Sequence, residues 1–67
     1  MPLVTIKAPE NVFTSEQKTA MIDKVTEAMV AVEGESFRDK TWVVYEEVPQ
    51  GHWAIGGAVI GGVTNSA

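Results

Sequence analysis

Hydrophobic and polar residues alternate over residues 3–7, which is the pattern of a β-strand with two different faces. Val4 and Ile6 fall on one face, and the three remaining side chains fall on the other. Residues 8–11 then break the alternation, because proline donates no hydrogen bond to a strand ladder and asparagine favours turns. We therefore expect the first strand to end before this segment.

A helical pattern follows the predicted turn. Thr14 and Gln17 match a capping box, in which the two side chains satisfy free backbone amides at a helix start. Gly34 is a typical residue just beyond a helix end. The pattern predicts a helix over residues 15–33. Its apolar stripe is expected to comprise Met21, Ile22, Val25, Ala28, Met29 and Val32.

A second strand is predicted over residues 41–47, where aromatic and β-branched residues are concentrated before Pro49 and Gly51. Strand, helix and strand in this order favour a parallel pair, because a crossover of this length can return the chain to the same edge. Residues 52–63 are too rich in glycine for a helix and too apolar for a solvated tail. We expect them to form a short hairpin or an edge strand against another chain.

The composition favours one small α/β domain, residues 1–67, that assembles with other copies. A 67-residue chain buries only about 60% of the surface that its unfolded form exposes. It has no cysteine, so no disulfide can compensate, yet 45% of its residues are hydrophobic. One helix also covers only one face of a sheet. The other face then needs a neighbouring subunit.

The charge pattern argues against several classes of partner. The net charge is −4, with nine acidic residues against five basic ones, so no basic patch is expected for nucleic acid or an anionic membrane. No apolar stretch approaches the roughly 20 residues of a membrane span, and no signal peptide is recognisable. The single histidine, His52, predicts no zinc site. We expect a cytoplasmic protein.

Pro2 is the first candidate for chemistry. Removal of Met1, which is usual before a small residue or proline, would leave a secondary amine directly before the first strand. An α-amino group titrates near ~7.7 to 8.0, and apolar burial lowers that pKa by disfavouring the charged form. Pro2 is therefore a candidate general base. A Met-Pro start also occurs in proteins in which the proline has no catalytic role. The assignment of Pro2 as a base therefore depends on features in the rest of the chain.

Four features occur together: Pro2 before a short strand, residues 15–18 (Ser-Glu-Gln-Lys) at a helix start, residues 46–48 (Glu-Glu-Val), and residues 51–57 (Gly-His-Trp-Ala-Ile-Gly-Gly). Together they resemble the tautomerase superfamily, in its small 4-oxalocrotonate tautomerase type. The resemblance implies a β-α-β protomer, usually in a homohexamer. It also implies a cofactor-independent isomerase in which the amino-terminal proline moves a proton within a small enolisable keto acid.

The resemblance also implies substrate-binding residues. Trp53 falls where the family carries a pocket aromatic that makes the surroundings of the proline apolar. Family arginines that bind the carboxylate and carbonyl groups of the substrate are replaced here, one by Val12 or Phe13 and the other by Trp42. We group Trp42 with Trp53 and Arg38 as the expected substrate-binding residues.

Arg38 is the only arginine of the chain, and we expect it to anchor the substrate carboxylate through two parallel hydrogen bonds. A surface arginine paired with Asp39 or Glu35 is an equally open interpretation. Lys7 and Lys40 are weaker candidates for anion binding. Four further residues are expected to be structural rather than catalytic; these are Tyr45, Glu46, Glu47 and His52. Glu46 and Glu47 are adjacent in a strand and point to opposite faces, so they cannot form a carboxylate dyad.

Two other functions stay open from the sequence. The same superfamily includes dehalogenases, hydratases and decarboxylases, for which Arg38, Glu46 and Glu47 would supply the additional polar groups. A catalytically inactive, oligomeric binding module is the other alternative. It is motivated by the missing family arginines and by Met1, because a retained methionine would make the nitrogen of Pro2 an amide without basicity.

Overall fold

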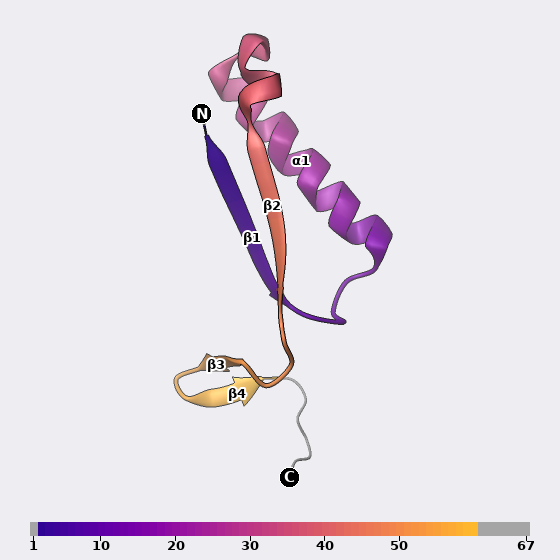
Figure 1. The fold of residues 1–67 in the computed structure, drawn as a ribbon, viewed down its shortest axis with the longest axis vertical. Coiled ribbons are helices and arrows are strands. Elements are labelled where there is room, and N and C mark those ends of the chain that lie inside the picture. The colour runs from indigo at the N-terminus through magenta and orange to yellow at the C-terminus, as the bar shows by residue number, and fades with distance from the viewer. Residues whose placement is uncertain (1, 61–67) are drawn as a thin grey trace.

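The protein was analysed as a computed structural model that describes residues 2–60. A parallel strand pair is connected by one long helix, and a small hairpin follows (Figure 1). This is the predicted β-α-β arrangement of the α/β class. The elements in chain order are β1 (Leu3–Pro9), α1 (Ser15–Glu33), the 3-10 helix η1 (Glu35–Lys40), β2 (Trp42–Val48), β3 (Trp53–Ile55) and β4 (Ala58–Ile60).

Strands β1 and β2 pair in parallel, as predicted, with Leu3 opposite Trp42 and Pro9 opposite Val48. The predicted end of the first strand was two residues too early. Pro9 is tolerated because it is the last residue of β1, and the amide of Glu10 continues the pairing by donating to the Val48 carbonyl at 2.8 Å. The strand pair is therefore seven residues long on each side.

Helix α1 covers one face of this two-stranded sheet and begins and ends where the sequence predicts. The capping box is present: the Gln17 amide donates to the Thr14 hydroxyl at 3.1 Å, and the Thr14 amide donates to the Gln17 side chain at 2.9 Å. Ala8 of β1 and Val30 of α1 are each only 6% exposed. They are the buried hydrophobic residues of the described part of the chain, one from the sheet and one from the helix.

The predicted apolar stripe is wrong in its last turn. Val32 is 90% exposed, whereas Val30 is buried and Glu33 is half-buried. Ala28 is also exposed, while Met21 and Met29 are half-buried as the stripe requires. Figure 1 shows that α1 lies at an angle to β1 and β2 rather than along them. Spacing alone does not report that crossing angle.

The segment between α1 and β2 is the 3-10 helix η1, where the sequence indicated only a linker. The amide of Phe37 donates to the Gly34 carbonyl at 3.1 Å, and the amide of Thr41 donates to the Arg38 carbonyl at 3.3 Å. These i to i+3 bonds define a short helix that has no apolar periodicity of its own. Strand β2 consequently begins at Trp42, one residue later than predicted.

The predicted hairpin is formed by β3 and β4, which pair antiparallel with Trp53 opposite Ile60. Gly56 and Gly57 connect them with φ angles of 57° and 87°, a left-handed conformation that glycine adopts readily. The described chain extends 51 Å along its longest axis. The hairpin and the amino-terminal end of β1 lie at opposite ends of it (Figure 1). Residues 61–63 of the predicted tail fall outside the described residues.

The two faces of the β1–β2 sheet differ sharply in their surroundings. We call the face beneath α1 the covered face. We call the opposite face the open face, and no described residue packs over it as α1 does over the covered face. Register and burial assign to the open face Leu3, Thr5, Lys7, Trp42, Val44 and Glu46. Leu3 is 61% exposed and Trp42 is 56% exposed.

Candidate functional site

Pro2 lies at the amino-terminal end of β1 and is half-buried. Its carbonyl accepts a hydrogen bond of 2.9 Å from the amide of Trp42, the first residue of β2. This bond fixes the backbone of Pro2 at the beginning of the strand pair. Leu3 and Trp42 lie opposite one another on the open face next to it. Pro2 therefore begins a part of the sheet in which large apolar side chains are exposed.

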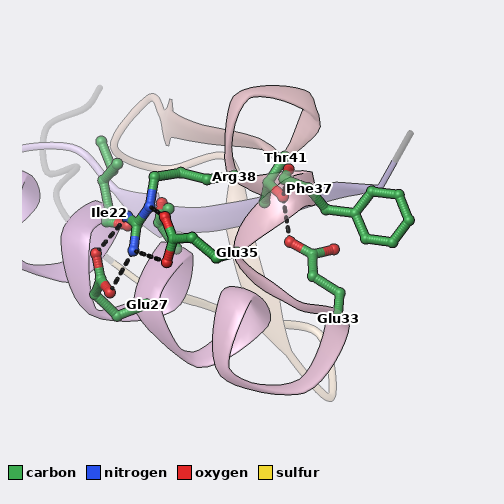
Figure 2. A network of polar contacts seen from close by, with 8 residues as sticks. Ile22, Glu27, Glu33, Glu35, Phe37, Arg38 and Thr41 are labelled. Atoms are coloured by element: carbon green, nitrogen blue, oxygen red, sulfur yellow. Dashed lines mark hydrogen bonds and ion pairs between the residues drawn. The ribbon is translucent and has the colours of Figure 1, made fainter.

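Arg38 is held by two glutamates, one from α1 and one from η1 (Figure 2). Its Nη1 donates to Glu27 Oε2 at 2.7 Å and its Nη2 donates to Glu27 Oε1 at 3.0 Å. Its Nε donates to Glu35 Oε2 at 2.5 Å, and Nη2 also contacts Glu35 Oε1 at 3.2 Å. We call these three residues the arginine clamp. It is a double bidentate arrangement of the kind that planar guanidinium groups favour.

The charges of the clamp reinforce one another. The Arg38 guanidinium lowers the pKa of the Glu27 carboxyl below its ordinary value, mainly by hydrogen bonding and then by charge attraction. Hydrogen bonding by Arg38 likewise lowers the pKa of Glu35. In turn, hydrogen bonds first to Glu27 and then to Glu35 raise the pKa of Arg38. The clamp is therefore fully ionised near neutral pH.

The expected pairing of Arg38 with Glu35 is observed, whereas Asp39 has Lys40 as its neighbour, with Nζ 4.0 Å from Oδ1. Figure 2 shows the guanidinium directed toward Glu27 of α1, while the ring of Phe37 points away from it. The role of Arg38 as an anchor for a substrate carboxylate stays a prediction. In this arrangement, however, a substrate would compete with two carboxylates of the protein itself.

Trp53 lies at the start of β3, in the hairpin, and is half-buried. The hairpin is at the far end of the molecule from Pro2 (Figure 1). Within one copy of the chain, the structure thus brings Pro2 and Trp42 together and leaves Trp53 apart from them. A pocket that contains both Pro2 and Trp53 requires a second copy.

The four residues expected to be structural are placed as follows. Glu46 forms an ion pair with Lys7 on the open face at 3.1 Å, and Glu47 pairs with Lys18 of α1. The two glutamates thus point to opposite faces, as predicted. Hydrogen bonding to Glu47 raises the pKa of Lys18. His52 is exposed in the turn before β3.

Tyr45 contributes to the helix–sheet packing on the covered face. The Nζ atom of Lys18 lies 5.8 Å from the centre of its ring, within the range of a cation–π contact. Its hydroxyl is buried, and no residue within 2–60 hydrogen-bonds to it. Tyr45 is paired with Ile6 in the register, several residues along the strands from Pro2. This position fits a packing role.

Residues 2–60 offer little support for other kinds of site. No group of three histidine, aspartate or glutamate side chains is placed to hold a metal ion there. None of the helices in that part of the chain is long and apolar enough to cross a membrane. A shallow hollow lies on the outward side of α1, beside residues that are all exposed; it is lined by Ser15, Glu16, Thr19, Ala20 and Asp23. It has no cationic lining residue and is built from a single helix.

Sequence reasoning missed the contribution of Glu27 and Glu33 to the neighbourhood of η1. Glu27 binds Arg38 across 11 positions, and the Thr41 hydroxyl contacts the Glu33 carboxylate across eight. The spacing of Glu35 and Arg38, three apart, was a usable signal for a local pair. No comparable local signal exists for the contacts between η1 and α1.

A comparison with protein families identifies the family of the chain. The family model described as "Tautomerase enzyme" matches residues 2–62. The chain belongs to the tautomerase family. It is 42% identical over 57 residues to a 2-hydroxymuconate tautomerase of Bacillus subtilis, across 85% of this chain and 89% of the relative. It is 39% identical to a probable tautomerase of Ralstonia nicotianae, across 85% and 79% of the two chains.

Solved structures agree with this family assignment. A structure from a study of 4-oxalocrotonate tautomerase isozymes of Methylibium petroleiphilum matches with a TM-score of 0.76 and 38% identity, across 87% of this chain and 90% of that chain. YwhB, a homologue of 4-oxalocrotonate tautomerase, matches with a TM-score of 0.75 and 40% identity, across 87% and 92%. The predicted superfamily and fold are confirmed. The protein is a tautomerase, an enzyme of the isomerase class.

Proposed function

We propose that this tautomerase moves a proton within a small enolisable keto acid, and that Pro2 is its general base after removal of Met1. The nitrogen of Pro2 takes the proton from the enol hydroxyl. As the carbonyl forms, the electron pair of the carbon–carbon double bond shifts to carbon. The protonated proline then returns the proton to that carbon, so the reaction is balanced without a cofactor.

The observation that carries this proposal is the position of Pro2. Its carbonyl is held by the Trp42 amide at 2.9 Å, so its nitrogen is fixed at the end of an ordered strand. Leu3 and Trp42 beside it would provide apolar surroundings once a second copy covers them. Such surroundings favour the neutral amine, which is the form that accepts a proton.

We further propose that the active site is shared between copies of the chain in a homohexamer. Trp53 would reach Pro2 only from a neighbouring copy, because the two residues lie at opposite ends of one copy (Figure 1). The exposed apolar side chains of the open face and of the hairpin, including Ile55 and Val59, support burial between copies. Trp53 would then form the apolar wall of the pocket, with Trp42 opposite to it.

The substrate class can be tested with two enols. Phenylenolpyruvate carries one carboxylate, and 2-hydroxymuconate carries two. We expect Met1-free protein, verified by mass spectrometry, to ketonise at least one of them. The value of kcat/KM should fall as the pH drops through the pKa of the Pro2 amine in the free enzyme.

The matched control is the same chain with an acetyl group on the nitrogen of Pro2. This group removes the basicity of the nitrogen, and the remainder of the chain stays as it was. The acetylated chain should be inactive while keeping the sedimentation coefficient of the active protein. Equal turnover by the two forms would exclude Pro2 as the base. Absence of turnover on both enols with the free amine would contradict the proposed substrate class.

A further inference from the structure

The arginine clamp connects α1 to η1, two elements that Gly34 joins in the sequence. Glu27 belongs to α1, whereas Arg38 and Glu35 belong to η1. The hydroxyl of Thr41 provides a second connection, because it contacts the carboxylate of Glu33 and the Phe37 carbonyl oxygen, 2.8 Å away. The 3-10 helix is thus fastened to α1 at both Arg38 and Thr41 (Figure 2).

The fastened segment leads directly to the residue that holds Pro2. The amide of Thr41 donates to the Arg38 carbonyl at 3.3 Å, and Trp42 follows as the first residue of β2. The amide of Trp42 is the donor to the carbonyl of Pro2. A continuous series of contacts therefore runs from Glu27 through Arg38 and η1 to Pro2.

The geometry of Arg38 does not favour direct binding of a substrate. The guanidinium has five N–H donors, and four hydrogen bonds to the two glutamates already use every one of its nitrogen atoms. One positive charge faces two negative charges, so the clamp carries a net charge of −1. An anionic substrate would be repelled by that charge and would have to displace a bidentate carboxylate.

We propose that Arg38 is a positioning residue, which Glu27 and Glu35 hold in place so that η1 fixes the start of β2 and thereby the Pro2 base. The inference rests on the proposed role of Pro2 in catalysis. It differs from the anchoring role expected from the sequence, in which Arg38 itself would grip the carboxylate of the substrate.

The two roles predict opposite results for the glutamates. If Arg38 positions Pro2, Arg38→Met and the double variant Glu27→Gln/Glu35→Gln should be impaired alike, because each breaks the same clamp. We expect kcat to fall roughly 10- to 100-fold with little change in KM, since small displacements of a catalytic group have effects of this size. Arg38→Lys should recover part of the loss, because it keeps the charge and loses the bidentate pairing.

The substrates sharpen this distinction. Phenylenolpyruvate and its methyl ester share the same enol, but only the acid offers a carboxylate to an anchor. A positioning role predicts the same fold-loss on both compounds. A loss confined to the acid, or a gain in turnover by the double glutamine variant on 2-hydroxymuconate, would overturn the proposal in favour of an anchor. Unchanged turnover of all three variants would also overturn it.

The matched control is Lys18→Met, which removes a different ion pair of α1, the one with Glu47 of β2. This pair lies toward the other end of the strands, since Glu47 is opposite Ala8 in the register. Its loss should leave the kinetic constants and the Pro2 signals near their wild-type values. Equal effects of Lys18→Met and Arg38→Met on kcat would show that any weakened helix contact suffices, which contradicts a specific positioning role.

A spectroscopic readout separates failure of this inference from failure of the proposed function. With ¹⁵N-labelled proline and tryptophan, the Pro2 nitrogen and the Trp42 amide can be followed by NMR without any turnover. Both signals should shift in the Arg38 variants and stay in place in Lys18→Met. If the wild type turns over no enol, the proposed function fails, yet unshifted signals in Arg38→Met would independently refute the positioning role.

Discussion

Both faces of the β1–β2 sheet carry large apolar side chains, but the surroundings of the two faces are very different. On the covered face, where α1 packs mainly against β2, Val4 and Ile6 are half-buried and Ala8 is buried. On the open face, Leu3 and Trp42 stay more than half exposed. Large apolar side chains of this kind stabilise a protein by about 1.5–3 kcal/mol each when they are fully buried. One face of the sheet therefore realises this stabilisation within a single chain, and the other does not.

The difference indicates how little of the stability resides in one chain. Among residues 2–60, only Ala8 and Val30 are buried hydrophobic residues, and no large side chain is completely buried. A domain of this size rarely gains more than about 3–5 kcal/mol from its own core. The free energy of unfolding should consequently depend on protein concentration, as it does when folding and association are coupled.

The largest expected effect comes from breaking the covered face. Val30→Asp would place an unpaired carboxylate at a position that is only 6% exposed. An uncompensated buried charge destabilises by about 3–5 kcal/mol, which matches the whole expected stability of the chain. We expect the variant to be unfolded by circular dichroism at neutral pH.

Val32→Asp is the matched control, because it makes the same change two positions further along α1, where the side chain is 90% exposed. It should keep the helical signal of the wild type. The interpretation of the covered face would be wrong if the two variants unfolded to the same extent.

The second-largest effect is expected on the open face, where an introduced charge should prevent association between copies without unfolding the chain. Val44→Asp changes a side chain that is opposite Thr5 and away from α1. Within one copy the new carboxylate would face solvent. In an assembly it would be buried between copies, at a penalty of several kcal/mol. Sedimentation at micromolar concentration should change from that of the proposed hexamer to that of smaller species, with loss of turnover.

Thr19→Asp, on the outward side of α1, adds the same charge where no contact between copies is proposed. It should sediment like the wild type. If Val44→Asp sedimented as the wild type did, the open face would not be the surface that assembles the enzyme.

The covered face was largely predictable from the sequence, because local patterns determine it. Alternation over residues 3–7 separated the two faces of β1, and the capping box identified the first residue of α1. The error at Val30 and Val32 has a tertiary cause, since helical spacing defines a stripe but not the angle at which the helix crosses the strands.

The candidate site was predictable only in part, for the same reason. Pro2 and Trp42 are brought together by the parallel strand pairing, which the order strand, helix, strand already predicts. The contact of Arg38 with Glu27 spans 11 positions and depends on how η1 folds back onto α1. The distance of Trp53 from Pro2 reflects the extended shape of one copy, so a proposed pocket with both residues involves a relation between chains.

The smallest expected effect comes from the arginine clamp, whose charges connect α1 to η1. The Arg38 guanidinium lowers the pKa of Glu27 and of Glu35 below the ordinary value of 4.5. A carboxyl whose pKa is lower in the folded state than in the unfolded state adds stability. That stability is fully present above the unfolded-state pKa, and it is lost as the pH falls through the folded-state pKa. The clamp should therefore stabilise fully at neutral pH and lose this contribution progressively as the pH falls below 4.5.

Thermal unfolding at pH 7 and in steps below pH 4.5, at one protein concentration, checks this expectation. The wild type should lose more of its Tm on acidification than Arg38→Met, because the variant has no clamp to lose. Lys40→Met removes the same charge from η1 but leaves the clamp intact, and its nearest acidic contact is 4.0 Å away, so it should follow the wild type. If the wild type and Arg38→Met lost the same amount of Tm on acidification, the clamp would add no stability to the fold.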